Sequence, residues 1–300
     1  MNTIVTLIAN PAATTLDADL VRMVASLLPD PEIAWLSDER AADVWSRQVL
    51  DEAAVHAFRS DLARHLAGMQ IDTAVQFLAA ENRRKKLLIA DMDSTMIQQE
   101  CIDELADEAG VGARVADITA RAMNGEIGFE GALRERVALL KGLPTSTIDA
   151  VIANRITLMP GGPELVRTMR KHGAWCALVS GGFVDFTSRI AEMIGFQENR
   201  ANRLVRKDGH LTGEVAEPIL GRQAKADALA EISARLGLEP ADVIAVGDGA
   251  NDLTMLSMAG AGVALHAKPA VAAQAGIRID HNDLTALLYL QGYRDSEIVR

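Results

Sequence analysis

Short apolar runs that end in polar or glycine-rich turns recur in the part of the chain that begins at residue 87. They cover residues 87–90, 176–179 and 243–246, and each has the length and continuous apolar character of a buried strand. Stretches with helical spacing lie between and after them, for example at 163–171, 184–194 and 225–236. Alternation of buried strands with helices predicts a parallel sheet covered on both faces.

One stretch breaks this alternation. Residues 97–157 are nearly all helical in pattern, with 116–123 and 129–140 as examples. This is too long for a simple crossover between two strands. We therefore expect a helical insertion that stands over the carboxyl ends of the strands.

The first 80 residues have the pattern of a separate, small α/β unit. We expect a strand at 3–9, a helix at 16–28 stopped by Pro29-Asp30-Pro31, a strand at 32–36 and a second helix within 62–78. Residues 81–86 include four consecutive basic residues, which we interpret as a solvated linker. The expected domains are therefore 1–80, either a regulatory or dimerising module or a packing appendage, and 81–300.

Composition narrows the class of protein. The net charge of −11 over 300 residues argues against bulk nucleic-acid binding, which favours basic patches. The two cysteines, Cys101 and Cys176, form no CxxC motif, so we expect no disulfide framework and a reducing, cytoplasmic setting. The first residues lack the basic region of a signal peptide, and no run approaches the roughly 18 apolar residues of a membrane span.

Candidate chemistry collects where the predicted strands end. Asp91 and Asp93 follow the first strand, Ser180-Gly181-Gly182 follows the second, and an acidic turn at 247–252 follows the third. Ligands bind at this edge in open α/β sheets. An ionised aspartate can attack a phosphate monoester without a base, provided that cations neutralise the charge of the phosphate.

Each of these groups has a chemical part that it could play. Asp91, Asp248 and Asp252 offer the hard oxygen ligands that Mg²⁺ prefers. Lys225 and Ser180 could hold phosphate oxygens, and Asp93 could serve as acid and then base. Alone, each motif is more often an ordinary turn or surface residue, and only the turn at 247–252 has enough carboxylates to favour function. Together and in this order they favour phosphoryl transfer.

The ordered set of motifs resembles the haloacid dehalogenase superfamily and, within it, the phosphoserine phosphatases. The matching text lies between about residues 86 and 290 and includes DMDST, AMNGEIGFEGALRERVALLKGL, SGGF, ANRL, DGHLTG and VGDGANDL. The resemblance implies a three-layer Rossmann-like core with a small helical cap. It also implies Mg²⁺-dependent hydrolysis of O-phosphoserine to serine, the last step of serine biosynthesis, with a small-molecule substrate and neither nucleic acid nor membrane as partner.

The resemblance also implies a role for each matched residue of the core. Asp91 would be the nucleophile, and Asp93 the acid/base whose backbone carbonyl also binds Mg²⁺. Asp248 would be a further metal ligand, with Asp252 holding the water shell of the metal. The phosphoryl group would be bound by Ser180, Gly181 and Lys225, with Asn251 assisting nearby.

Specificity would belong to the cap. Glu100 matches the position that pairs with the substrate ammonium, and Arg136 the position that holds the carboxylate, for which the arginine fork is suited. Met123 and Phe129 match apolar residues that close over the substrate. Without the resemblance, all four would be interpreted as ordinary surface or core residues of helices.

Two alternatives remain open. One is an enzyme of the same mechanism that acts on another phosphomonoester or transfers the phosphoryl group to another alcohol. The other is a phosphate-sensing binding protein, against which Asp93 counts because a binder needs no acid/base. The first 80 residues bear a loose likeness to ACT-type ligand-sensing domains, so amino-acid binding or a homodimer is an expectation for them.

Overall fold

Successive side chains along the central strands point to opposite faces of the sheet and pack into two hydrophobic cores. In this computed structural model, which describes residues 2–79, 82–123 and 126–300, six parallel strands lie in the order β12-β11-β10-β5-β6-β7. The strands are β5 (Leu87–Ala90), β6 (Trp175–Phe183), β7 (Glu198–Asn202), β10 (Val243–Gly247), β11 (Ala261–Leu265) and β12 (Ile277–Ile279).

Helices cover both faces of this sheet. Leu88 and Ala90 belong to the core under α7 (Gly162–Lys171), α8 (Val184–Ile194) and α12 (Ala286–Leu290). Leu87 and Ile89 belong to the core under α9 (Arg222–Leu236), α10 (Leu253–Met258) and α11 (Pro269–Ala272). The predicted three-layer Rossmann-like α/β fold is confirmed, and its strands point their carboxyl ends to one edge.

The predicted helical insertion contains α3 (Cys101–Glu108), α4 (Gly112–Met123), α5 (Phe129–Ala138) and α6 (Ser146–Asn154). Its two connections to the core run side by side, since Ile97 forms a bridge with Leu158 and the Met159 N–H donates to the Met96 carbonyl. A hairpin of β8 (Leu204–Lys207) and β9 (His210–Val215) also packs on α5. The cap therefore receives a second segment that sequence analysis did not assign to it.

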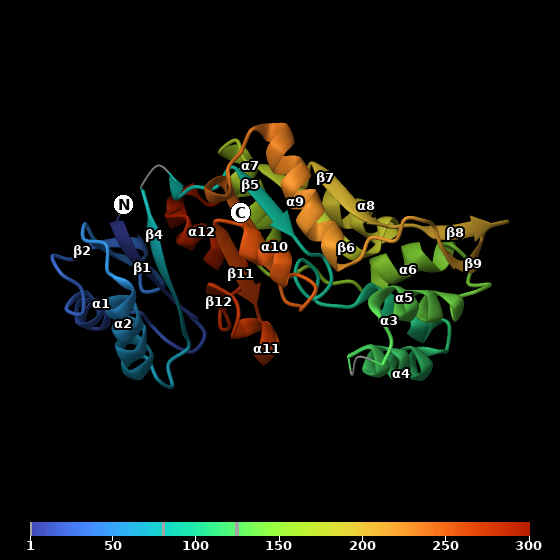
Figure 1. Ribbon diagram of the computed structural model, residues 1–300, viewed down its shortest axis with the longest axis horizontal. Helices are drawn as coiled ribbons and strands as arrows, with labels where there is room; N and C mark the ends of the chain where they lie inside the picture. Colours follow the sequence, from blue (N-terminus) through green and yellow to red (C-terminus); the bar gives the residue numbers. More distant parts are fainter. Residues whose placement is uncertain (1, 80–81, 124–125) are drawn as a thin grey trace.

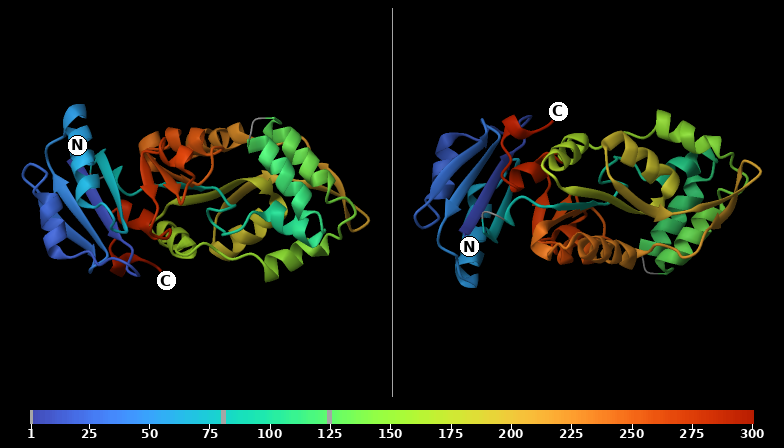
Figure 2. Two further views of the ribbon diagram at one scale, coloured as in Figure 1. Left: turned by 90° about the horizontal axis from the view of Figure 1, so that it is seen from below. Right: turned by 90° about the horizontal axis from the view of Figure 1, so that it is seen from above.

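The N-terminal unit is a four-stranded antiparallel sheet in the order β2-β3-β1-β4 with two helices. Its elements are β1 (Asn2–Ala9), α1 (Ala18–Ala25), β2 (Glu32–Ser37), β3 (Ala41–Ser46), α2 (Glu52–His65) and β4 (Ile71–Leu78). Short 3-10 helices lie at Pro240–Asp242 and Asp295–Glu297. The N-terminal unit and the cap lie at opposite ends of the molecule, with the parallel sheet between them (Figures 1 and 2).

Two expectations for this unit are wrong. Residues 62–78 contain only the end of α2 followed by β4, because the alternation of buried and half-buried side chains along β4 has a period of two. β3 was not predicted, although five of its six residues are buried. The boundary predicted at residues 80–81 lies outside the described residues, and the division into domains stays a prediction.

The basic segment is not a solvated linker. Arg83 and Lys85 are buried, and Arg83 forms an ion pair of 2.7 Å with Asp43 of β3. The Lys85 ammonium donates to the carbonyls of Asn82 and Ala241. Arg83 also donates to the carbonyls of Leu290 and Tyr289, so this segment ties the N-terminal sheet to the unit that contains the parallel sheet. Among the described residues, no helix is long and apolar enough to cross a membrane.

Candidate active site

The register of the sheet brings three of the motifs together. Ala90 is paired with Val246 on one side and with Leu178 on the other, so Asp91, Asp248 and Ser180 follow at the same edge. Lys225 reaches this edge from the first turns of α9. Residues separated by more than 150 positions in the chain thus converge as the strand pattern predicts.

Asp91 lies at the centre of this cluster. The Lys225 ammonium is 2.5 Å from an Asp91 carboxylate oxygen and 2.6 Å from one of Asp252. All three side chains are at most 7% exposed, so the ion pairs are shielded from water. Burial acts to lower the pKa of Lys225, but the charges of Asp91 and Asp252 outweigh it and raise the pKa. Lys225 is therefore a permanent cation at this centre.

Asp93 lies between two hydrogen-bond donors. Its carboxylate accepts from the Cys101 backbone N–H at 2.9 Å and from the Ser180 hydroxyl at 3.1 Å. Burial, followed by the charge of Asp91, raises the pKa of Asp93. A carboxyl whose pKa is raised beside an ionised one has the properties of a proton donor next to a nucleophile.

A group of three carboxylates could hold a metal ion. Oxygens of Asp91, Asp248 and Asp252 lie within 4.8 Å of one another. Thr95 donates to Asp248 at 3.1 Å, and the Gly249 N–H donates to Asp252 at 3.0 Å, so both side chains are held in place. Burial, followed by the charge of Asp91, raises the pKa of Asp252 to about 7. This donor set fits a hard cation such as Mg²⁺.

Glycines make room for these carboxylates. A Cβ on Gly247 would lie 2.4 Å from the Asp252 carboxyl carbon, and one on Gly249 would lie 2.2 Å from the Asn251 side-chain oxygen. A Cβ on Gly182 would lie 2.9 Å from a carboxylate oxygen of Asp93. The glycines in the predicted loops therefore allow close approach of side chains to the backbone.

The cap brings an acid and a base toward the same centre. Glu100 immediately precedes α3 and accepts a hydrogen bond from Ser94, and burial followed by the charge of Asp93 raises the pKa of Glu100 to about 8. Arg136 of α5 is half-buried and donates to the Ala132 carbonyl and weakly to Thr119. Burial lowers the pKa of Arg136, while Asp103, Glu100 and Asp93 act in the opposite direction, so these acids lie within electrostatic reach of it.

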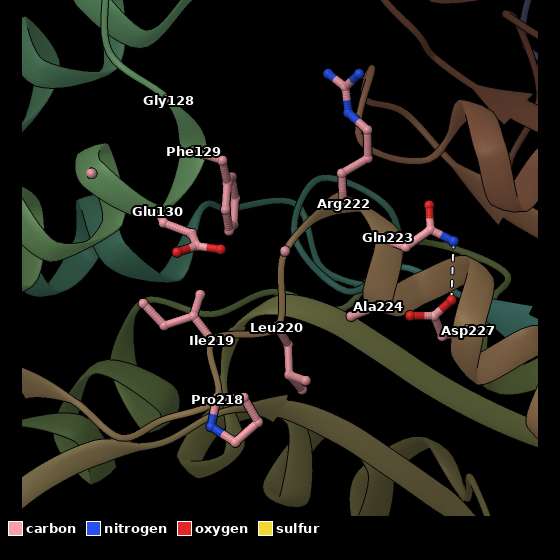
Figure 3. A pocket seen from close by; sticks show the side chains of 12 residues that line it. Gly128, Phe129, Glu130, Pro218, Ile219, Leu220, Arg222, Gln223, Ala224 and Asp227 are labelled. Carbon is pink, nitrogen blue, oxygen red and sulfur yellow. Dashed lines mark hydrogen bonds between the residues drawn. The ribbon is translucent and has the colours of Figure 1, made fainter.

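Phe129 lies where the cap meets the core. Its ring lies near Gly181 and Gly221, since a Cβ added at either glycine would lie 3.3 or 3.6 Å from a ring carbon. The side chain extends from the cap toward the segment that carries Leu220 and Arg222 (Figure 3). Met123 is the last residue of α4, and its side chain lies outside the described residues. Asn251 is half-buried in the acidic turn.

Sequence reasoning missed several residues that hold these groups in place. Thr95 positions Asp248, Ser94 positions Glu100, and the Cys101 N–H positions Asp93. Asn202 connects Gly181 with Leu220. In the sequence, these residues stood out only because they lie inside the matched motifs. A strand or helix leaves a periodic pattern of apolar residues, but a single hydroxyl or amide side chain leaves no such pattern.

Comparison with known proteins agrees with this arrangement. The model of the haloacid dehalogenase-like hydrolase family matches residues 88–257. A curated phosphoserine phosphatase of Archaeoglobus fulgidus is 43% identical over 229 residues, which are 76% of this chain and 66% of that protein. One of Streptomyces coelicolor is 41% identical over 80% of this chain and 58% of its own length. The chain thus spans less than two thirds of the length of these relatives.

Solved structures extend the similarity to three dimensions. A HAD family hydrolase from Salmonella enterica serovar Typhi superposes with a TM-score of 0.82 at 30% identity, covering 96% of this chain and 98% of that one. A substrate-bound phosphoserine phosphatase complex has a TM-score of 0.64 at 42% identity, covering 68% of this chain and 97% of that one. The first similarity includes the N-terminal unit, whereas the second extends over about two thirds of the chain.

Proposed function

The chain belongs to the haloacid dehalogenase-like hydrolase family, and from this premise we propose that it hydrolyses O-phospho-L-serine to L-serine and inorganic phosphate. The observation that carries the proposal is the convergence of two contacting pairs, Asp91 with Lys225 and Asp93 with Ser180, at the carboxyl edge of one parallel sheet. The names of the similar proteins support phosphoserine as the substrate. This reaction would supply serine as the last step of its biosynthesis.

The first half of the reaction transfers the phosphoryl group to Asp91. Its carboxylate oxygen attacks phosphorus, the bond from phosphorus to the serine oxygen breaks, and Asp93 gives its proton to that oxygen. Lys225, Ser180 and the Gly181 backbone hold phosphate oxygens as charge develops on them, with Asn251 assisting at the edge of the site. Asp93 already contacts Ser180, so proton donor and phosphate ligand are aligned.

The second half releases phosphate from Asp91. Asp93, now ionised, takes a proton from water, whose oxygen attacks phosphorus while the bond to the Asp91 oxygen breaks. Mg²⁺ bound by Asp91, Asp248 and the Asp93 carbonyl, with Asp252 beside it, would supply Lewis-acid neutralisation of the phosphate charge. Lys225 supplies one ammonium to this group of carboxylates through its ion pairs with Asp91 and Asp252.

Recognition of the serine part belongs to the cap. We propose that Glu100 pairs with the ammonium and Arg136 with the carboxylate of the substrate, while Met123 and Phe129 exclude water. The support is that the charges of Asp103, Glu100 and Asp93 act to raise the pKa of half-buried Arg136, against the lowering by burial. A matching acid and base read both charged groups of an amino acid.

The test of this function is an assay of phosphate release from L-phosphoserine and from a panel of other phosphomonoesters, with Mg²⁺ and with a chelator. We expect release that needs Mg²⁺ and is at least tenfold faster in kcat/KM for phosphoserine than for the panel. Release from the panel but not from phosphoserine would contradict the substrate, and release that continues in the chelator would contradict the metal.

The cellular setting is part of the same proposal. Both cysteines are buried and unpaired, which fits a reducing compartment such as the cytoplasm. We retain residues 1–80 as a domain that dimerises the chain or binds an amino acid, and 81–300 as the phosphatase domain with its cap at about 97–157. Light scattering of the full chain tests the homodimer, and calorimetry of the full chain with serine tests the ligand, with serine binding at the active site as the alternative outcome.

A further inference from the structure

A strap of residues 217–221 lies between the cap and the helix that carries Lys225. The cap contacts the strap at two points: Arg134 of α5 forms an ion pair with Glu217, and the Phe129 ring packs on Gly221. A cavity of about 660 Å³ opens beside these contacts, lined by residues 128–131, the strap from Pro218 and the start of α9 (Figure 3). The strap is therefore one part of the core that the cap meets, directly before the helix that carries Lys225.

Asn202 joins this strap to the loop that holds Ser180. It is the last residue of β7 and is 2% exposed. Its amide nitrogen donates to the Gly181 carbonyl at 2.8 Å and to the Leu220 carbonyl at 3.2 Å, while its oxygen accepts from the Leu220 N–H at 2.7 Å. Both amide protons of Asn202 therefore bond to backbone carbonyls, one at Gly181 and one at Leu220, which are 39 residues apart in the chain.

These two segments form the seat of Phe129. The ring lies against Gly181, whose carbonyl Asn202 binds, and against Gly221, the residue after Leu220. Asn202 bonds to Gly181 itself and to Leu220, the neighbour of Gly221, so one buried amide connects the two backbone segments that lie near the ring.

We propose that Asn202 is a positioning residue that sets the distance between the Ser180–Gly181 loop and the strap, and so determines where Phe129 seats when the cap covers the site. Its hydrogen bonds go only to backbone groups, so it acts through Gly181 and Leu220. The same bonds fix the Gly181 backbone, which is proposed to bind phosphate, and the approach to α9 with Lys225. This inference rests on the proposed phosphatase function.

The first variant is Asn202→Asp, which keeps the size and the acceptor of the side chain but replaces the donor to two carbonyls with a carboxylate oxygen. We expect kcat/KM for L-phosphoserine to fall about 10- to 100-fold, since buried carbonyls lose their partner and face a negative charge. The matched control is Asn199→Asp on the same strand. The Asn199 oxygen only accepts, from Thr187 and Ser188, so this change should stay within about twofold.

A double-mutant cycle separates positioning from general destabilisation. Phe129→Ala should lower kcat/KM in the wild-type background and have at most a third of that fold-effect in the Asn202→Asp background, because the seat is already displaced. Thermal unfolding verifies that each variant folds. In case Asn202→Asp does not fold, Asn202→Ser, which keeps one donor, goes through the same cycle. For Asn202→Ser we expect a smaller loss of kcat/KM than for Asn202→Asp, and again an effect of Phe129→Ala that is reduced in the double variant.

Three results would overturn the inference. The first is that the losses of kcat/KM from the Asn202 and Phe129 changes simply multiply in the double variant. The others are equal losses of kcat/KM in the Asn202 and Asn199 variants, and full activity in a folded Asn202→Asp variant. A wild type that hydrolyses another phosphomonoester but not phosphoserine overturns the proposed substrate instead. The cycle is then run on that ester, so failure of the function and failure of the positioning role remain distinguishable.

Discussion

Asp93 has a raised pKa because it is buried beside Asp91, and it contacts Ser180. Asp93→Asn keeps the shape of the side chain but can neither give nor take the proton. General acid–base groups contribute about 10²- to 10⁴-fold, so kcat should fall within that range while KM changes little. Steady-state kinetics measure this, and a variant that retains more than a tenth of wild-type kcat would exclude Asp93 as the acid/base.

Arg136 tests substrate recognition at the same scale. Arg136→Gln should raise KM for L-phosphoserine about 10- to 100-fold, the usual worth of a charge-assisted hydrogen bond, and change turnover of O-phosphoethanolamine less than threefold, because that ester lacks the carboxylate. Arg121→Gln is the control, since Arg121 is exposed and pairs with Glu135 on the cap surface. Equal effects on the two esters would show that Arg136 does not read the carboxylate.

At the scale of elements, the connection between β4 and β5 carries a buried ion pair. Arg83→Met leaves Asp43, which is 1% exposed, without its partner. Breaking a buried pair from one side costs about 3–5 kcal/mol of unfolding free energy, whereas the neighbouring Arg84→Met, whose partner Glu297 is partly exposed, should cost at most about 1 kcal/mol. Urea unfolding of both variants measures the difference, and equal costs would contradict it.

Lys85 lies in the same connection and should make the free energy of unfolding depend on pH. Burial lowers the pKa of Lys85 to about 8, with Asp242 acting in the opposite direction. Between this value and the unfolded value of 10.5 the unfolded chain binds more protons, so stability rises with pH. From pH 7 to 9.5 the wild type should gain about 1–2 kcal/mol of unfolding free energy relative to Lys85→Met. A parallel pH dependence of the two proteins in urea unfolding would refute this.

Helices and strands were predictable where the local pattern of apolar residues agrees with the faces that the fold buries. The strand at 87–90 and the helix at 184–194 match β5 and α8, because both are apolar on the faces that become buried. β4 was not recognised because half-buried strands at a sheet edge resemble helices in short windows. The basic run 83–86 misled for a different reason: charge predicts exposure unless a partner such as Asp43, distant in sequence, is known.

The candidate site follows the same rule. Asp91 and Asp248 were predictable because they directly follow strands of one parallel sheet, and Ser180 because it lies near the carboxyl end of the strand between Trp175 and Phe183. The choice of Glu100 and Arg136 came from family resemblance, and no spacing in the chain distinguishes them from neighbouring charges. Thr95 and Asn202 lay inside the matched motifs, but no role could be assigned to them, since their importance lies in contacts with residues far along the chain.

At the scale of the whole molecule, the N-terminal unit is anchored to the phosphatase unit by polar contacts. Asp72 of β4 accepts hydrogen bonds from the backbone N–H groups of Asp280, His281 and Asn282, which follow β12. Arg40 reaches Thr285 at 2.8 Å. The N-terminal unit and the cap lie at opposite ends of the molecule (Figure 2), so these anchoring contacts are far from the cap.

The central step of the proposed reaction is a covalent bond between Asp91 and phosphorus during turnover. The most direct measurement is acid quenching of the enzyme in Mg²⁺ with ³²P-labelled L-phosphoserine, followed by peptide mapping. We predict acid-stable, hydroxylamine-labile label on the peptide that contains Asp91, and none in Asp91→Asn. Phosphate release without labelled protein, label on another residue, or normal turnover by Asp91→Asn would contradict the account.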